Sequence, residues 1–257
     1  SGLTNDVAYT CTVTATNSEG TSPASAATDP IIPAPEAVAT VSEIQITEAY
    51  IGLVGRAPDP GGLAYWVNQL DSAIAAGQTR SYAMKNLTND ITLSQEWDTG
   101  IGANDGLTQS GAEAIVRAMY LNLFARPATA SDVAYWSADL TMGRVTESEM
   151  VVLLILGAQS KGNADSQVLG FKRQGASYYV SKITKTLFTR DNATKAVSDV
   201  TDEQSLLASQ NATDALVGAS ARSASAATDA PRISTLPAGA LLMLVGLMLF
   251  VARRFSS

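Results

Sequence analysis

The sequence predicts a mainly all-α protein: a helical bundle, preceded by a partial β-sandwich hairpin and followed by one C-terminal transmembrane helix. Three patterns predict this class. Over residues 41–218, apolar residues recur at helical spacing behind helix-start signals, and part of this stretch recurs 70 positions later. Only residues 3–15 alternate apolar and polar side chains as a strand does. A long uncharged apolar run lies near the end of the chain.

Residues 1–28 are predicted to form two strands. Apolar side chains fall on one face of residues 3–15 and threonines on the other, Asn17–Gly20 supplies a turn, and residues 21–25 form a short edge strand. Leu3, six residues before Tyr9, resembles the tyrosine corner near the end of a fibronectin type III domain. The resemblance implies that only about the last two strands of a sandwich are present. A lone hairpin is marginally stable in water.

The first predicted helix follows a Pro-rich linker, residues 29–40, whose prolines favour an extended spacer. Ser42 and Gln45 have the spacing of a capping box, and Gly55 is a residue that can end a helix. The apolar face of this helix consists of Ile46, Tyr50, Leu53 and Val54.

The second predicted helix begins at Asp59, because an N-cap residue followed by Pro60 is a common start, and Gly77 ends it. Its apolar face consists of Leu63, Trp66, Val67, Leu70 and Ile74.

This helix–loop–helix unit is repeated without a gap. The repeated positions are Tyr50 and Tyr120, Leu53 and Leu123, Arg56 and Arg126, Tyr65-Trp66 and Tyr135-Trp136, and Leu70 and Leu140. The start signals recur too: Ser110 with Glu113 opens one helix, and Thr129 with Asp132 opens the next, which Gly143 ends. Matching faces and caps predict two copies of one structural unit.

Further helices are predicted to complete the bundle. Thr146 with Glu149 caps residues 150–156, which are apolar on all sides and suit the buried centre of an all-α domain. Another helix is marked by Tyr179, Val180, Ile183 and Leu187. A last, weaker one covers residues 202–217, so the repeat domain spans 41–218.

The tandem Tyr-x-x-Leu-x-x-Arg … Tyr-Trp pattern resembles a bacterial domain family of unknown function, DUF four-two-one-four. Residues 171–180 also look like a third segment of that family. The resemblance covers most of the helical stretch. It implies an extracellular or surface setting and carries no known catalytic residues.

The C-terminal part is predicted to be a tether and a membrane anchor. Residues 219–235 are small and polar and are predicted to be a flexible linker. Within residues 236–254, Leu236 to Ala252 carries no charge and Arg253 and Arg254 follow it. A helix of this length spans about 25 Å, at the short limit for a membrane crossing. Arg residues are retained in the cytoplasm, so the rest of the protein is expected outside.

The order of this C-terminal region resembles bacterial sorting signals of the PEP-CTERM and IPTL-CTERM type. The motif residues are Ile233-Ser234-Thr235-Leu236, which depart from Ile-Pro-Thr-Leu at one position. The resemblance implies a membrane sorting protease as a partner, which removes the helix. The localisation expected is therefore the cell envelope, with the chain either spanning the membrane once or attached at the surface.

Composition excludes several functions. The net charge of −7 argues against a nucleic-acid partner. The absence of histidine removes the commonest general base and metal ligand. Cys11, the single cysteine, is predicted to be a small apolar strand residue. No cofactor is predicted, and no catalytic, cofactor-binding or metal site.

Several residues have side chains that suit chemistry or binding. The acidic ones are Asp59, Asp90, Glu96, Asp98 and Asp132, of which Asp59 and Asp132 are explained as helix caps. Arg56 and Arg126 suit either an anionic ligand, such as a phosphate or acidic sugar, or a structural role, which is favoured: capping the carbonyls of the preceding helix or pairing with a neighbouring acid. Trp66 and Trp136 are expected in the core, whereas Tyr65 and Tyr135 lie off that face and are expected to be partly exposed.

Three functions are compatible with the sequence. The favoured one is a non-enzymatic, exported surface protein for adhesion, scaffolding or display, with a surface protein or polysaccharide as partner. The second is the tail of a larger secreted or surface enzyme with its catalytic domain upstream. The third is a self-assembling surface-layer subunit.

Overall fold

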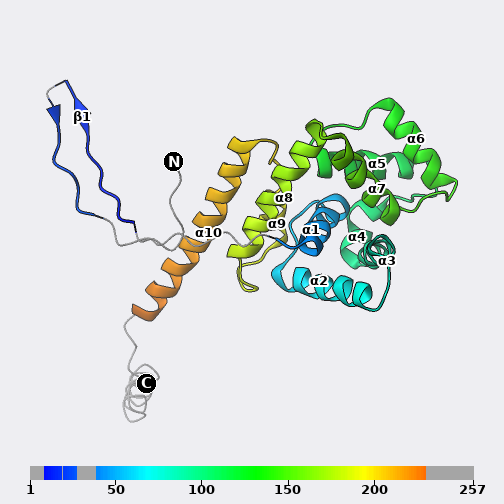
Figure 1. Cartoon of the computed structure of the whole chain (residues 1–257), viewed down its shortest axis with the longest axis horizontal. Helices are drawn as coiled ribbons and strands as arrows, with labels where there is room; N and C mark the ends of the chain where they lie inside the picture. The colour runs from blue at the N-terminus through cyan, green and yellow to red at the C-terminus, as the bar shows by residue number, and fades with distance from the viewer. Residues whose placement is uncertain (1–8, 19, 28–38, 230–257) are drawn as a thin grey trace, which may run out of the picture.

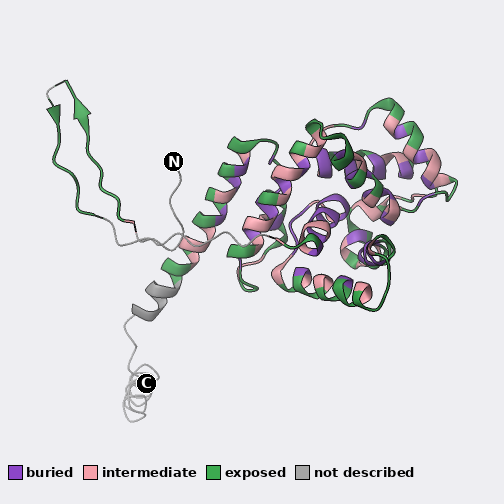
Figure 2. Cartoon of the chain, in the orientation of Figure 1, coloured by how far each residue is buried: buried purple, intermediate pink, exposed green. Residues whose placement is uncertain are grey.

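The structure is a computed structural model that describes residues 9–18, 20–27 and 39–229. In these residues it is mainly helical with one two-stranded hairpin, as the sequence predicts, and it contains ten α-helices and one 3-10 helix. Figure 1 shows the hairpin apart from the helical body, in which α1 lies centrally. The buried side chains form one core shared by these helices (Figure 2).

The hairpin consists of β1 (Thr16–Asn17) and β2 (Gly20–Thr21), which pair antiparallel, so the predicted turn is confirmed. Backbone bonds continue the pairing from Ser22 N to Ala15 O at 2.8 Å and from Ser25 N to Val13 O at 2.9 Å. The predicted half-burial is wrong: apart from the partly buried Tyr9, the described residues of this segment are exposed, Cys11 among them. The described residues include no second sheet to cover it. Leu3 lies outside them.

α1 (Val41–Val54) begins two residues before the predicted capping box. Thr40 has the extended backbone of an N-cap, its side chain accepts from Glu43 N, and the Glu43 carboxylate accepts from Thr40 N. Ser42 is therefore inside the helix, where its hydroxyl donates to Asp71 at 2.5 Å. Both pairs fit the same sequence pattern, and the earlier one forms. Gly55 ends the helix in the left-handed region, at φ 68°, as predicted.

α2 (Pro60–Ala75) begins as predicted, with Asp59 accepting from Gly62 N at 2.7 Å and Pro60 at the first helical position. Two further helices were not predicted: α3 (Arg80–Thr92) and α4 (Gln95–Thr99), followed by a 3-10 helix, η1 (Ile101–Ala103). α3 buries the residues Ala83, Met84, Leu87, Thr88 and Ile91.

The second copy contains α5 (Gln109–Phe124), α6 (Ala130–Thr141), α7 (Glu147–Lys161) and α8 (Ala164–Lys182). The capping boxes predicted at Thr129 and Thr146 are confirmed. The one predicted at Ser110 is wrong, because Thr108 is the N-cap and accepts from Gly111 N at 3.2 Å.

The repeated unit therefore has four helices rather than two, since α3 and α4 correspond to α7 and α8. Thr79 and Thr146 cap the third helix of each copy, and Ser94 and Asn163 cap the fourth. The two copies meet where α1 crosses α5. There the Asn122 amide donates to the carbonyl of Gly52, its counterpart 70 positions earlier, at 3.2 Å. A Cβ at position 52 would clash with the side chain of Val151 in α7 and would lie 3.1 Å from that of Leu123 in α5, so glycine allows α1 to approach both helices closely.

The prediction that residues 150–156 are buried on all sides is wrong in part. Met150 and Val151 are fully buried, but Leu153 and Leu156 are 48% and 50% exposed. α7 packs on α1, α3, α5 and α8, which leave its outer face uncovered.

The C-terminal helices also differ from prediction. α8 ends at Lys182, so Ile183 and Leu187 lie beyond it, and α9 (Arg190–Lys195) follows. α10 (Glu203–Asp229) continues past the predicted end, so the predicted flexible linker is helical as far as Asp229. This extension is rich in alanine, the residue with the highest helix propensity.

No helix among residues 39–229 has both the length and the apolar content needed to cross a bilayer. The predicted anchor, Leu236 to Ala252, lies outside the described residues.

The end of the first helix in each copy gives a stability prediction. Ala125, the counterpart of Gly55, adopts φ 51°, a region that costs an L-residue roughly 1–2 kcal/mol. We expect Ala125→Gly to raise the free energy of unfolding by about 1 kcal/mol. Gly55→Ala should lower it by at least as much, because its Cβ would also lie 3.0 Å from Asn122 Oδ1. Urea unfolding measures both, and a loss of stability in Ala125→Gly would contradict the left-handed geometry.

Candidate functional site

Each repeat contains the same polar cluster behind its exposed tyrosine. In the first copy, Trp66 Nε1 donates to the Tyr50 hydroxyl at 2.9 Å. In the second, Trp136 lies beside the Tyr120 hydroxyl in the corresponding arrangement. Both tryptophans are partly buried and pack on the core, as predicted. The repeated aromatic residues of this cluster therefore hold the first two helices of each copy together.

Arg56 is the centre of the first cluster and is 5% exposed. Its Nε and one terminal nitrogen each donate to Glu96 at 2.6 Å, and its other terminal nitrogen donates to Ala57 O at 2.7 Å. The guanidinium lies 5.3 Å from the ring centroids of both Tyr50 and Phe188. Burial raises the pKa of Glu96, but the bonds and charge of Arg56 outweigh it and lower the pKa below 4.5. Of the two structural roles favoured from the sequence, Arg56 has the pairing with a neighbouring acid.

Arg126 makes the same bidentate ion pair with Asp165, at 2.7 Å for both bonds, but its side chain is 38% exposed. It lies over the rings of Tyr120 and Phe124. Glu96 and Asp165 occupy the same place, the second residue of the fourth helix in each copy. The two copies thus share an Arg–acid pair that differs in burial.

The difference in burial arises from the segment between α8 and α10. Phe188 covers Arg56, and Ala57 N donates to Ala193 O in α9 at 3.0 Å. At the position of Ala57 the second copy has Pro127, which has no N–H to offer. The first cluster is closed by the chain itself, and the second stays open to solvent.

The structure does not bring the five acidic candidates together. Asp59 and Asp132 cap α2 and α6, as predicted, and Glu96 pairs with Arg56. Asp90 and Asp98 are exposed on α3 and α4. The described residues contain no group of three or more acidic or cysteine side chains that could hold a metal ion.

Tyr65 and Tyr135 are 55% and 61% exposed, as predicted. Each packs edge-to-face on the tryptophan that follows it, with ring centroids 4.9 and 5.1 Å apart. Each also lines a pocket between the second and third helices of its copy. The pocket between α2 and α3 has a volume of about 190 Å³, and the one between α6 and α7 about 250 Å³.

These equivalent pockets differ in chemistry. The α2–α3 pocket is lined by Gln69, Gln78, Asn86 and Asp90 beside Tyr65. In the α6–α7 pocket, Leu153 and Gly157 replace Asn86 and Asp90, and the charged residues Arg126, Asp132, Lys161 and Asp165 lie along it. The first pocket offers neutral hydrogen-bonding groups and one carboxylate, and the second offers charges of both signs.

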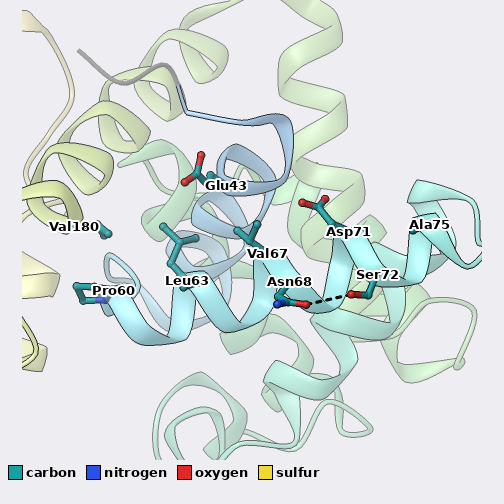
Figure 3. Close-up of a pocket in the computed structure, with 10 residues that line it drawn as sticks. Glu43, Pro60, Leu63, Val67, Asn68, Asp71, Ser72, Ala75 and Val180 are labelled. Atoms are coloured by element: carbon teal, nitrogen blue, oxygen red, sulfur yellow. Dashed lines mark hydrogen bonds between the residues drawn. The ribbon is translucent and has the colours of Figure 1, made fainter. Parts of the chain in front are cut away.

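A larger, open groove of about 720 Å³ runs along α2 (Figure 3). Leu63 and Val67 form an apolar floor, and Val180 of α8 lies opposite Pro60. Its carboxylates already have partners: Glu43 caps α1, and Asp71 accepts from Ser42. The groove therefore offers mainly apolar surface.

Two buried charges were not predicted. Glu48 is 1% exposed and accepts from Gln159 and from Arg173, at 2.9 and 3.1 Å. Burial raises its pKa, although Arg173 acts in the opposite direction. Lys172 is also 1% exposed, and its ammonium donates to Val197 O at 2.8 Å and Ser198 O at 3.2 Å. The only signal in the sequence was a charged residue within an otherwise apolar helical pattern.

Lys172 predicts an unusual dependence of stability on pH. Burial lowers its pKa to about 8, against 10.5 for an ordinary lysine. Between these values the unfolded chain binds more protons than the native one, so stability rises with pH. We expect a rise of up to about 3 kcal/mol across this window. Urea unfolding from pH 7.5 to 9.5 should show about 2 kcal/mol of this rise, and the dependence on pH should be absent in Lys172→Met. Equal slopes in the two proteins would contradict the prediction.

Comparison with known proteins adds no relative from which a role could be transferred. No family model, no curated protein and no solved structure matches the chain, so the resemblances to the DUF four-two-one-four family, fibronectin type III domains and sorting signals remain hypotheses.

Proposed function

We propose that this chain is a non-enzymatic, exported cell-surface protein that binds a polysaccharide partner for adhesion, scaffolding or display. The observation that carries the proposal is the pair of equivalent pockets, each with an exposed tyrosine beside polar side chains. An aromatic ring beside hydrogen-bonding groups is a common arrangement for binding sugars, because it serves both the apolar and the hydroxyl-bearing faces.

The polar residues that would otherwise suggest chemistry have structural partners. Arg56 and Arg126 are each held by a carboxylate, and Glu48 and Lys172 are buried between helices. These interactions favour a binding role over a catalytic one. The exported setting rests on the apolar run Leu236 to Ala252 and the arginines after it.

The binding part is tested by co-sedimentation of the full chain, kept in mild detergent, with insoluble polysaccharides. We expect retention in the pellet and no release of new reducing ends. New reducing ends would show an enzyme, and no retention on any polysaccharide or isolated envelope would contradict binding.

The exported part is tested by treating intact cells with a protease. Residues 39–229 should be digested from outside, whereas a fully protected chain would contradict surface exposure. Detection of the fragment that contains Leu236 to Ala252 in the membrane fraction would show whether the anchor is retained.

A further inference from the structure

We propose that the α2–α3 pocket binds an uncharged hexose unit of a polysaccharide and that the equivalent α6–α7 pocket does not. This inference rests on the proposed function and adds the class of ligand and the pocket that binds it. Four polar residues that are exposed to solvent line one pocket: Gln69, Gln78, Asn86 and Asp90. Within the described residues their side chains make no hydrogen bond or ion pair with protein groups, so all four are available to a ligand.

The hydrogen-bonding groups of the pocket match sugar hydroxyls. A hydroxyl both donates and accepts, and so does each of the three amide side chains, while the Asp90 carboxylate adds two accepting oxygens. A cationic ligand would use the carboxylate but would leave the amide N–H groups unmatched. The pocket also has one exposed ring rather than the cage of rings that quaternary ammonium ligands prefer.

Tyr65 supplies the apolar surface. Its ring is more than half exposed and is held edge-to-face by Trp66, whose indole is in turn fixed by the Tyr50 hydroxyl. A ring that is already oriented loses little conformational freedom when a sugar packs against it. The C–H groups of a pyranose can therefore pack on Tyr65 while its hydroxyls reach the amides.

Charge and size restrict the ligand further. No lysine or arginine lines the α2–α3 pocket, and the whole chain carries a net charge of −7, so a phosphate or acidic sugar would be repelled. The volume of about 190 Å³ lies below the range of pockets for drug-sized ligands, which favours a single sugar ring with its neighbours in solvent.

The second copy serves as an internal control. Tyr135 and Trp136 keep the aromatic pair, but Leu153 and Gly157 remove the amide and carboxylate of Asn86 and Asp90. Most of the polar lining of that pocket is ionic, and two of these groups, Arg126 and Asp165, pair with each other. Its one amide side chain, Asn163, accepts from Ser166 N as the cap of α8. It lacks the set of free amides that a neutral sugar needs.

The test is calorimetric titration of the full chain with short neutral oligosaccharides of glucose, mannose and galactose, with oligogalacturonate as the acidic comparison. We expect binding of at least one neutral oligosaccharide. Tyr65→Ala and the double variant Asn86→Leu/Asp90→Ala, which removes the two polar groups that the second copy lacks, should weaken it about tenfold or more. Tyr135→Ala should leave it unchanged, and thermal melts should show that all three variants remain folded.

The inference is overturned if no neutral oligosaccharide binds, if Tyr65→Ala binds as tightly as the wild type, or if only oligogalacturonate binds. Polysaccharide retention that is lost in Tyr135→Ala but kept in Tyr65→Ala would overturn this assignment and leave the proposed function standing. Loss of all retention in the wild type would overturn both.

Discussion

Arg56→Ala is expected to lower the free energy of unfolding by about 3–4 kcal/mol, and Arg126→Ala by about 1 kcal/mol. The two arginines make the same bidentate pair, but the side chain of Arg56 is 6% exposed, whereas that of Arg126 is 38% exposed. Removing Arg56 leaves the partly buried Glu96 with only Arg190, 3.7 Å away, as a partner. It also removes the contact between Phe188 and the guanidinium. The two acids differ little in exposure, with side chains 21% exposed for Glu96 and 17% for Asp165, so the difference rests on the burial of the arginine and its contact with Phe188.

The comparison needs urea unfolding of both variants together with Arg56→Lys. Lysine keeps the charge but cannot make two parallel bonds to Glu96. The free energy of unfolding of Arg56→Lys should therefore lie between those of the wild type and Arg56→Ala. Glu96 adds a dependence on pH, because its pKa is lowered in the native state. The stability that this pair contributes is present above pH 4.5 and is lost as the pH falls through the lowered pKa of Glu96 in the native state. The free energies of unfolding of the wild type and Arg56→Ala should therefore converge in acid. Equal losses in Arg56→Ala and Arg126→Ala would contradict the role assigned to burial.

Local signals in the sequence located many of the helix ends correctly. Asp59, Thr129 and Thr146 cap the helices they were expected to cap, because a side-chain acceptor three residues before a free N–H acts within one turn. Where two overlapping patterns compete, as at Thr40 and Ser42, local spacing does not choose between them. The repeat located the Tyr–Trp–Arg cluster for the same reason, since each copy folds in a similar local setting.

Long-range contacts could not be predicted from such patterns. Glu48 meets Arg173 across 125 positions, and a single charge in an apolar pattern does not indicate its partner. The pocket residues Asn86 and Asp90 lie on α3, a helix that was not predicted. The predicted end of α8 was wrong because Ile183 continues the apolar spacing of the helix. In the structure its backbone is extended, and the residue is buried by packing against the rest of the fold.

The face of α8 that receives α9 leads to the second large effect. We expect Gly175→Ala to lower the free energy of unfolding by about 2 kcal/mol, although alanine is the better helix former. A Cβ at position 175 would lie 2.7 Å from the backbone carbonyl oxygen of Ala196, which already accepts from Ser209 at 3.0 Å. A backbone atom cannot rotate away as a side chain can. The segment that Lys172 holds by its two carbonyl bonds would have to shift.

Gly170→Ala is the matched control, because the same helix leaves open space at that position. It should raise stability by about 0.5–1 kcal/mol through helix propensity alone. The effect of Lys172→Met should also be smaller in the Gly175→Ala background, since both residues hold the same backbone segment and their effects are coupled. Urea unfolding of the three single variants and of the double variant measures each quantity. If Gly175→Ala proved as stable as Gly170→Ala, the close packing of the α9–α10 connection against α8 would be contradicted. The same packing positions the α8–α9 segment, which covers Arg56. A shift of this segment should therefore weaken the cluster around Arg56 and leave the cluster around Arg126 unchanged.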